Sequence, residues 1–221
     1  MIIPILASTP DWLAILKPEG IGMHQDSAAD GTPVAGIVTL LQQQQAEELW
    51  PVHRLDKVTS GVLLLARNAE AAARLSQLFA DHRIQKYYVA RASSRPKKKQ
   101  GWVRGDMEKT RNGSWRLAHS QNNPAITRFD SCYDAEQQKR LFLLRPFTGK
   151  THQLRVALRS LGAPIDGDER YKGESADRTY LHAMALCFED QGQLHRIVQL
   201  PVSGDWGHIP AEWHQPWDIL P

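Results

Sequence analysis

The sequence predicts an α+β fold with a mainly antiparallel sheet flanked by helices and loops. Most apolar segments after residue 87 are short and bounded by polar, glycine or proline residues, a pattern typical of strands. Only three segments of the chain place apolar residues at helical spacing. Because parallel neighbours need long crossover connections, so few helices favour antiparallel pairing.

The first predicted elements are a strand and a helix. Residues 12–16 are apolar and run into Lys17-Pro18-Glu19-Gly20, where proline and glycine favour a turn. A helix is predicted to begin with Thr32 as its N-cap and Pro33 as its first residue. The apolar side chains expected on one face of this helix are Val34, Ile37, Val38 and Leu41.

A second helix is predicted after the apolar strand at residues 62–66. Asn68 is positioned to cap its N-terminus, because a short polar side chain can accept a hydrogen bond from the first helical turn. The apolar residues that follow helical spacing are Leu75, Leu78, Phe79 and Ile84.

Strands dominate the rest of the chain and are interrupted by one helix. We expect strands at residues 88–92, 126–133, 141–144, 181–188 and 194–200. The helix is indicated by a shared apolar face, with Gly162 placed at its C-terminal end. The members of that face are Leu154, Ala157, Leu158 and Leu161. The tail is expected to be pinned onto the core by Trp206, Trp213 and Trp217.

Length and composition indicate a globular protein. The 221 residues are 42% hydrophobic and 23% charged, which suits a chain that buries a sizeable core. One domain or two closely packed lobes fit this length, and we expect a single domain over residues 1–221. Cys132 and Cys187 lack paired spacing, and no apolar run is long enough to cross a bilayer. A cytoplasmic protein without membrane insertion is therefore expected.

Positive charge is concentrated between Arg83 and Arg111. This stretch holds ten basic residues against two acidic ones, whereas the whole chain has a net charge of only +3. Two tyrosines and Trp102 are interleaved with these residues, as on surfaces that bind phosphates and stack bases. The simpler alternative is a solvated loop face. Residues 93–101, rich in Lys, Arg and Ser, are predicted to be the least ordered part of the chain.

One carboxylate has the surroundings of a reactive group. Asp56 lies between Arg54 and Lys57, and two hydroxyl residues and Gly61 follow, just before the apolar block at 62–66. Nearby positive charge keeps a carboxylate ionised, and a turn beside a strand can hold it rigidly. These properties suit a nucleophile. Taken alone, Asp56 can also be a turn aspartate that caps or pairs locally.

Five blocks of the sequence, in this order, resemble motifs of the RluA family of pseudouridine synthases. They are Lys17 to His24, His53 to Gly61, Lys86 to Ala90, Thr148 to Tyr171, and Leu181-His182-Ala183. The resemblance implies the family's α+β fold, with a mainly antiparallel mixed central sheet. It also implies the isomerisation of uridine in RNA to pseudouridine, which needs neither a cofactor nor a metal.

The resemblance also implies roles for individual residues. Asp56 matches the family's catalytic aspartate, and Arg155 matches the basic residue that keeps it ionised and aimed. Tyr88 matches the active-site tyrosine, which can stack against the uracil and is able to assist removal of the C5 proton. Tyr87 is the alternative if the register of this motif is shifted by one. Leu181 matches an apolar position in the pocket wall.

The implied substrate is tRNA, ribosomal RNA or both, bound by a monomer. Arg54, next to the catalytic turn, is placed to fill the space left by a flipped-out uridine. Lys86, Arg91 and the run Lys97-Lys98-Lys99 are expected to hold phosphates without reading the RNA sequence. The family's optional S4-type RNA-binding domain is expected to be absent, because few residues precede Lys17.

Other functions find less support in the sequence. Gly149-Lys150-Thr151 imitates the end of a phosphate-binding loop, but Leu144 stands where that loop needs its first glycine. The segment Asp166-Gly167-Asp168-Glu169 lacks the further ligands of a calcium loop and is predicted to be a surface turn. Two alternatives remain: a non-catalytic RNA-binding protein on the same scaffold, and a glycoside or nucleoside hydrolase that uses Asp56 with a second carboxylate.

Overall fold

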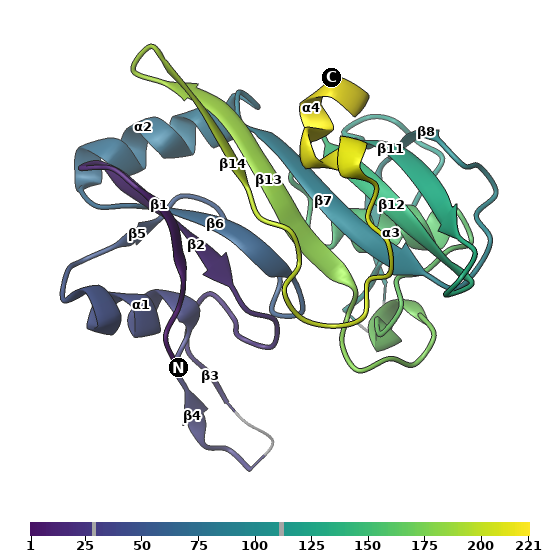
Figure 1. The fold of residues 1–221 in the computed structure, drawn as a ribbon, viewed down its shortest axis with the longest axis horizontal. Coiled ribbons are helices and arrows are strands. Elements are labelled where there is room, and N and C mark those ends of the chain that lie inside the picture. The colour runs from purple at the N-terminus through teal and green to yellow at the C-terminus, as the bar shows by residue number, and fades with distance from the viewer. Residues whose placement is uncertain (28–29, 111–112) are drawn as a thin grey trace. The chain divides into compact units, whose positions relative to one another are not determined.

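The structure is a computed structural model that describes residues 1–27, 30–110 and 113–221 (Figure 1). The chain forms two compact units. The first unit contains Met1–Ile84 and Ala183–Leu200, and the second contains Gln85–His182 and Pro201–Pro221. Each unit has its own section of antiparallel sheet, which agrees with the α+β class predicted from the sequence.

The sheet section of the first unit has the order β1-β2-β6-β13, with β5 paired to β6 and β14 paired to β13. The pairs β1–β2, β2–β6, β5–β6 and β13–β14 are antiparallel. The bounds of these strands are β1 (Ile5–Ser8), β2 (Trp12–Lys17), β5 (Trp50–Pro51), β6 (Ser60–Ala66), β13 (Leu181–Asp190, from Ala183 in this unit) and β14 (Gln193–Val198). The predicted strands at 12–16, 62–66, 181–188 and 194–200 are thereby confirmed.

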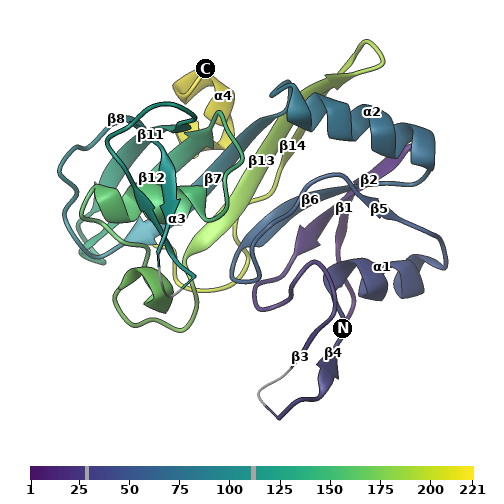
Figure 2. The ribbon, with the colours of Figure 1, turned by 180° about the vertical axis from the view of Figure 1, so that it is seen from behind.

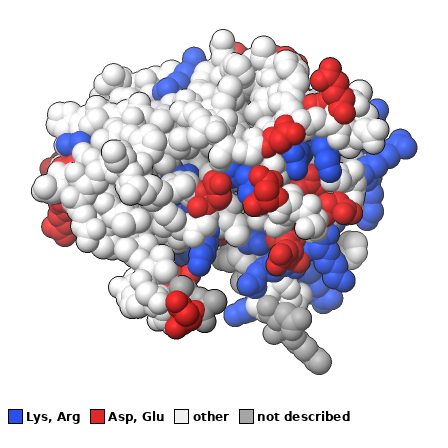
Figure 3. Space-filling model, turned by 60° about the horizontal axis from the view of Figure 1, so that its bottom comes forward, with Lys and Arg blue, Asp and Glu red and all other residues white. Residues whose placement is uncertain are grey.

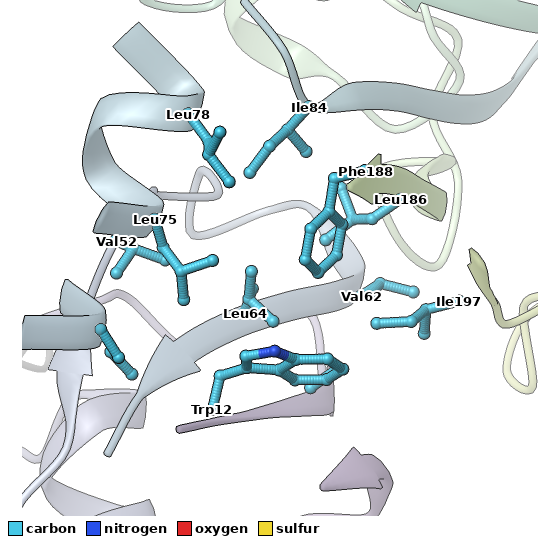
Figure 4. Close-up of a cluster of buried hydrophobic side chains, with 13 residues drawn as sticks. Trp12, Val52, Val62, Leu64, Leu75, Leu78, Ile84, Leu186, Phe188 and Ile197 are labelled. Atoms are coloured by element: carbon cyan, nitrogen blue, oxygen red, sulfur yellow. The ribbon is translucent and has the colours of Figure 1, made fainter. Parts of the chain in front are cut away.

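Two helices lie on opposite sides of β2 and β6, as Figure 1 and Figure 2 both show: α1 (Ile37–Gln45) and α2 (Ala69–Ala80). Under α2, a cluster of buried side chains joins the helix to the sheet (Figure 4). Leu75 and Leu78 come from the helix, and Trp12, Leu64 and Phe188 come from the strands. Burying one such side chain contributes about 1.5–3 kcal/mol, so this cluster is a main source of the unit's stability.

The N-terminus of α2 agrees with the sequence, but its C-terminus does not. Asn68 has an extended backbone, and its Oδ1 accepts a hydrogen bond from the Ala71 N–H at 2.8 Å, as an N-cap does. The helix ends at Ala80, and His82 has a positive φ of 57°. Ile84 therefore reaches the same buried cluster from beyond the helix rather than from its last turn.

The prediction that the first helix begins at Thr32 and Pro33 is wrong. Pro33–Val34 forms strand β4, which pairs with β3 (Asp26–Ser27), and α1 begins at Ile37. The Thr32 N–H donates to Asp30 Oδ1 at 2.9 Å. This local turn competes with a helical start, because it uses the aspartate side chain to satisfy the backbone.

The sheet section of the second unit has the order β7-β12-β11-β8, and all three pairings are antiparallel. The bounds are β7 (Gln85–Ala92), β8 (Gly101–Gly105), β11 (Ala125–Asp134) and β12 (Lys139–Pro146). The predicted strands at 88–92, 126–133 and 141–144 are confirmed. A small hairpin of β9 (Met107–Lys109) and β10 (Trp115–Leu117) lies between β8 and β11 in sequence.

The helix α3 (Gln153–Ser160) covers one face of this sheet section. Gln153 Nε2 donates to Thr127 Oγ1 at 3.0 Å, which ties the helix to the face of β11 on which Thr127 lies. Gly162 follows the helix with a positive φ of 79°, as predicted for its C-terminal end. Since alternate residues of a strand point to opposite faces, the register decides which side chains face α3.

The C-terminal tail packs on the other face of the second unit. It contains a 3-10 helix (Ala211–His214) and a short α-helix, α4 (Pro216–Ile219). Trp206 and Trp213 are buried, and Trp217 meets Tyr87 edge-on with ring centroids 6.5 Å apart. Tyr87 also donates a hydrogen bond to the Leu220 carbonyl at 3.3 Å. The prediction that tryptophans pin the tail to the core is confirmed.

Gly61 provides a test of the packing around β6. Its φ is +119°, and a Cβ atom there would lie 2.2 Å from the Ala183 carbonyl oxygen of β13. Gly61→Ala should therefore reduce the free energy of unfolding by about 3 kcal/mol or more, measured by urea unfolding. Gly101→Ala is the matched control: its φ is +130° and nothing lies within 4 Å. It should lose only about 1–2 kcal/mol. Equal losses would show that the close approach to β13 is unimportant.

Candidate active site

Asp56 lies on a tight turn that leads into β6. The turn spans residues 56–59 and is closed by a hydrogen bond from the Thr59 N–H to the Asp56 carbonyl at 2.9 Å. The Asp56 side chain is half-buried, whereas Leu55 and Thr59 on either side are buried. The turn thus leaves the Asp56 carboxylate partly exposed while its buried neighbours anchor the main chain.

A buried lysine fixes the main chain of this turn. Lys17 ends β2 opposite Gly61 of β6 and has no exposed surface. Its ammonium donates to the carbonyls of Pro18 and Thr59, both at 2.8 Å, and more weakly to the carbonyl of Lys57 at 3.4 Å. Charge-assisted hydrogen bonds of this kind are stronger than neutral ones. The entry segment of the chain and the Asp56 turn are therefore held by one charged group.

Further contacts hold the segment before and after Asp56. His53 accepts the Leu64 N–H at Nε2 over 2.9 Å, and its ring stacks on Phe79 with centroids 4.4 Å apart. Because that nitrogen accepts, the ring proton is on Nδ1. Lys57 pairs with the exposed Asp26 at 2.6 Å, and this hydrogen bond lowers the pKa of the Asp26 carboxyl.

In the second unit, the register of β7 separates the two adjacent tyrosines. Tyr88 pairs with Leu144 in β12, which pairs with Phe129 in β11, so Tyr88 faces the same side as Thr127 and α3. Tyr87 points to the other side and is fully buried under the C-terminal tail. The unshifted register therefore puts Tyr88, and not Tyr87, on the face that carries Arg155.

Lys86 lies two residues before Tyr88 and faces the same side. It is half-buried, and a Cβ atom placed on Gly149 would lie 4.0 Å from its Nζ, so the ammonium is next to the loop before α3. Burial lowers the pKa of Lys86, because a desolvated ammonium is disfavoured. No other described residue forms a hydrogen bond or ion pair with this ammonium, which leaves it suited to an anionic ligand.

Arg155 is fixed by a carboxylate that the sequence did not reveal as its partner. Its Nε and Nη2 each donate to Asp168 at 2.7 Å, and both side chains are buried. The Tyr171 ring centroid lies 5.0 Å from the guanidinium carbon. This bidentate geometry fixes the plane of the guanidinium as well as its position.

The prediction that residues 166–169 form a surface turn is therefore wrong. Asp166 is as deeply buried as Asp168 and accepts hydrogen bonds from Arg91 Nε at 3.0 Å and from Ser93 N and Oγ. Arg91 in turn lies 3.4 Å from the centroid of the Tyr180 ring. Arg91 is buried and cannot hold RNA phosphates, contrary to the expectation from the sequence.

Gln153 and His152 order the start of α3. Gln153 accepts the Thr148 hydroxyl at 2.7 Å and the Lys150 N–H at 3.0 Å through Oε1, while its amide nitrogen bonds to β11. His152 Nδ1 lies 2.8 Å from the Tyr171 hydroxyl, whose pKa is raised by burial. Sequence reasoning assigned neither residue a role. Their place at a helix start between polar residues was the only available signal.

The other predicted RNA-binding residues are distributed over both units. Arg54 is exposed on the loop before Asp56, and Lys97-Lys98-Lys99 is exposed in the second unit. The segment that holds these lysines was predicted to be the least ordered, but its Lys97 N–H donates to the Leu161 carbonyl at 2.8 Å. Leu181 is buried at the start of β13. Arg111 lies outside the described residues.

On the face drawn in Figure 3, lysines and arginines are intermixed with carboxylates rather than gathered into one uninterrupted basic surface. Among the described residues no group of three His, Cys, Asp or Glu side chains is arranged to hold a metal ion. None of the described helices is long and apolar enough to cross a membrane. Both cysteines are free thiols.

Known proteins match the chain over most of its length. The model of the RNA pseudouridylate synthase family matches residues 11–160. The chain belongs to this family. A Haemophilus influenzae protein named "Uncharacterized RNA pseudouridine synthase" is 46% identical over 217 residues, which cover 97% of this chain and 95% of that protein. The chain is accordingly an RNA pseudouridine synthase, an isomerase, and the resemblance seen in its motifs is confirmed.

Two further proteins, one relative in sequence and one solved structure, are also similar to this chain. "Ribosomal large subunit pseudouridine synthase C" from Rickettsia felis is 31% identical over 186 residues, which cover 81% of this chain and 60% of that protein. The solved structure of "Human RNA Pseudouridylate Synthase Domain Containing 4" matches with a TM-score of 0.70 and 26% identity, over 90% of this chain and 89% of that one. The pseudouridine synthase fold is thus supported by sequence and structure together.

The pair of Arg155 and Asp168 predicts a marked asymmetry between single and double substitutions. Asp168→Leu alone should lower the free energy of unfolding by about 3–5 kcal/mol, because it leaves the buried guanidinium of Arg155 without the charge of Asp168. The double variant Arg155→Met with Asp168→Leu should lose much less, because no charge is left buried. Urea unfolding of the two single variants and the double variant completes the cycle. Additive losses would contradict a coupled pair.

Proposed function

We propose that the chain isomerises one or more uridines in tRNA or ribosomal RNA, with Asp56 as the reacting carboxylate. Membership of the RNA pseudouridylate synthase family supplies the reaction. The name of the Rickettsia felis relative supports ribosomal RNA as one substrate class. The observation that carries the role of Asp56 is its position on the turn whose carbonyls bind the buried Lys17 ammonium.

The reaction exchanges one glycosidic bond for another. The bond from ribose C1′ to uracil N1 breaks, the uracil turns while it stays bound, and its C5 joins C1′. C5 then loses its proton and N1 gains one, so no atoms are lost or gained overall. A carboxylate beside the sugar can attack C1′, stabilise a cationic sugar, or remove the C2′ proton to give a glycal. Each of these routes needs an ionised and rigidly placed Asp56, and none needs a cofactor or a metal.

Arg155 and Tyr88 are proposed as the partners of Asp56 in this reaction. The face of the second unit that carries α3 also carries Tyr88, and Asp168 fixes the orientation of the Arg155 guanidinium. A guanidinium with a fixed orientation can keep the carboxylate of its proposed partner, Asp56, ionised. Tyr88 can stack on the uracil and assist removal of the C5 proton. Leu181 is proposed as an apolar residue of the pocket wall.

Basic residues that take no part in bond breaking or bond formation are proposed to bind the RNA. Lys86 and the exposed run Lys97-Lys98-Lys99 are suited to phosphates, which they hold without reading the sequence. Arg54 is proposed to take the space of the flipped-out uridine, because it is exposed and lies two residues before Asp56. We further propose that the chain works as a monomeric single catalytic domain in the cytoplasm, where its RNA substrates are found.

The test is a single-turnover assay of Asp56→Asn with RNA that carries tritium at uridine C5. The substitution keeps the shape of the side chain but removes its charge and nucleophilicity, so tritium release should fall at least about 10³-fold. RNA affinity and the unfolding midpoint should stay close to those of the unsubstituted protein. Asp81→Asn, at an exposed carboxylate of the same unit, is the control and should keep full activity.

Each other outcome points to a different conclusion. Substantial tritium release by Asp56→Asn would exclude Asp56 as the reacting group. Free uracil among the products of the unsubstituted protein would favour a hydrolase. RNA binding by the unsubstituted protein without any tritium release from total tRNA or ribosomal RNA would favour a non-catalytic RNA-binding protein.

A further inference from the structure

One face of the second unit carries an arginine-rich aromatic surface that the proposed chemistry does not use. We propose that this surface, made of Trp102, Arg104, Arg128 and Phe147 and called the Trp102 platform, binds an unstacked nucleotide and its phosphates in the RNA substrate. The proposal rests on the RNA substrate of the proposed function but not on the role of Asp56. The platform lies within the second unit, on the opposite side of the sheet from Tyr88.

The strand register places these side chains together. Trp102 of β8 pairs with Arg128 of β11, and Arg128 pairs with Arg145 of β12. Directly opposed residues of neighbouring strands point to the same face, as do residues two apart in one strand. Arg104 therefore stands beside Trp102 on this face. Val103, between Trp102 and Arg104, and Thr127, directly before Arg128, point to the other face and are buried.

The contacts of Trp102 are those of a cationic stacking site. The guanidinium carbons of Arg104 and Arg128 lie 4.6 Å and 5.7 Å from its ring centroid, and the Phe147 ring lies 5.1 Å away. Trp102 nevertheless keeps 41% of its surface exposed, which is unusual for the largest apolar side chain. Aromatic rings flanked by arginines are the common way to hold an unpaired base and its phosphate.

The charge of the platform is not neutralised by acidic side chains. Neither Arg104 nor Arg128 forms an ion pair with a carboxylate side chain of any described residue. Arg128 donates at 3.1 Å to an oxygen of the α-carboxyl group of Pro221, the last residue of the printed sequence, and this contact offsets part of its charge. Asp130, two residues further along β11, instead accepts the Ser131 N–H at 2.8 Å. Two arginines without a side-chain carboxylate partner beside an exposed indole complement a phosphate chain with bases better than they complement an apolar or basic partner.

The C-terminal tail covers the part of this sheet face that lies next to the Trp102 platform. Further along the same row, Tyr87 is covered by the tail, and Arg145 donates to the Leu220 carbonyl at 3.0 Å. The tail therefore closes the inner part of this face, and the outer part with Trp102 and Arg104 stays open. Phe147 is followed directly by Thr148, which begins the loop before α3. An RNA strand can thus pass from the α3 face to the platform around the end of β12.

The test is fluorescence anisotropy of a labelled oligouridylate across a potassium chloride series. Trp102→Ala should weaken binding about tenfold, the loss expected for one stacked base, without changing the salt dependence. Trp102→Phe should restore most of the affinity, because a ring is present again. Arg104→Gln and Arg128→Gln should each lower the slope of log affinity against log salt by about 0.7, the value for one phosphate of a single strand.

Tyr133→Ala is the matched control. Tyr133 lies on β11, is 57% exposed and has the Arg140 guanidinium 5.6 Å from its ring, but it lies far along the strand from Trp102. Its substitution should leave affinity within about twofold of the unsubstituted protein, well below the effect of a lost stack. Unchanged RNA affinity of Trp102→Ala, or an equal loss of affinity with Tyr133→Ala, would contradict the proposal that the Trp102 platform binds RNA.

The platform and the catalytic role of Asp56 can fail independently. Asp56→Asn should bind the oligouridylate normally, and Trp102→Ala should release tritium at the normal single-turnover rate when the enzyme is saturating. If Trp102→Ala binds normally while Asp56→Asn is inactive, only the platform is excluded. If Trp102→Ala binds weakly while Asp56→Asn is active, the platform stands and the proposed role of Asp56 is excluded.

Discussion

The ammonium of Lys17 is the constraint on which the geometry around Asp56 depends. It is fully buried and is satisfied by main-chain carbonyls from two segments, residues 17–20 and the turn at 56–59. A buried charge without partners is costly, so the ion and the carbonyls hold one another in place. The Gly20 N–H adds a hydrogen bond to the Lys57 carbonyl at 2.8 Å. The main chain that carries the Asp56 carboxylate is held in place without a substrate, and this preorganisation is what the proposed role of Asp56 requires.

The second unit uses the same principle with arginines. Arg155 is held by Asp168 and Arg91 by Asp166, and all four groups are buried around the segment that follows α3. Such pairs contribute little net stability, but they fix orientation, since breaking either one leaves an uncompensated charge. The Tyr171 hydroxyl joins this arrangement to His152 and to the β10 hairpin through Trp115. The face of the second unit that carries Arg155 is thus ordered by polar contacts, whereas the core of the unit is ordered by apolar ones.

Most of the fold could be predicted from the sequence, because apolar periodicity and local caps determine it. The strands β2, β6 and β7, and the N-cap Asn68, all follow from residues close in sequence. The start of α1 could not be predicted. Thr32 followed by Pro33 looks like a helix start in the sequence, but the Thr32 N–H instead donates a hydrogen bond to the Asp30 side chain in a local turn. The buried partners of Arg155 and Lys17 could not be predicted either, because contacts between residues far apart in sequence leave no periodic signal. The family resemblance predicts roles for Asp56 and Arg155 but does not indicate which contacts hold either residue in place.

The most direct test of this view of the Asp56 turn is the single-turnover rate of tritium release by Lys17→Met. Methionine fills a similar volume but leaves the carbonyls of the turn without their donor. If Lys17 positions the reacting carboxylate, the folded variant should release tritium at least about tenfold more slowly, a loss of ~1.4 kcal/mol, while RNA affinity is unchanged. A Lys17→Met protein that reacts at the rate of the unsubstituted enzyme would contradict the central role of this ammonium.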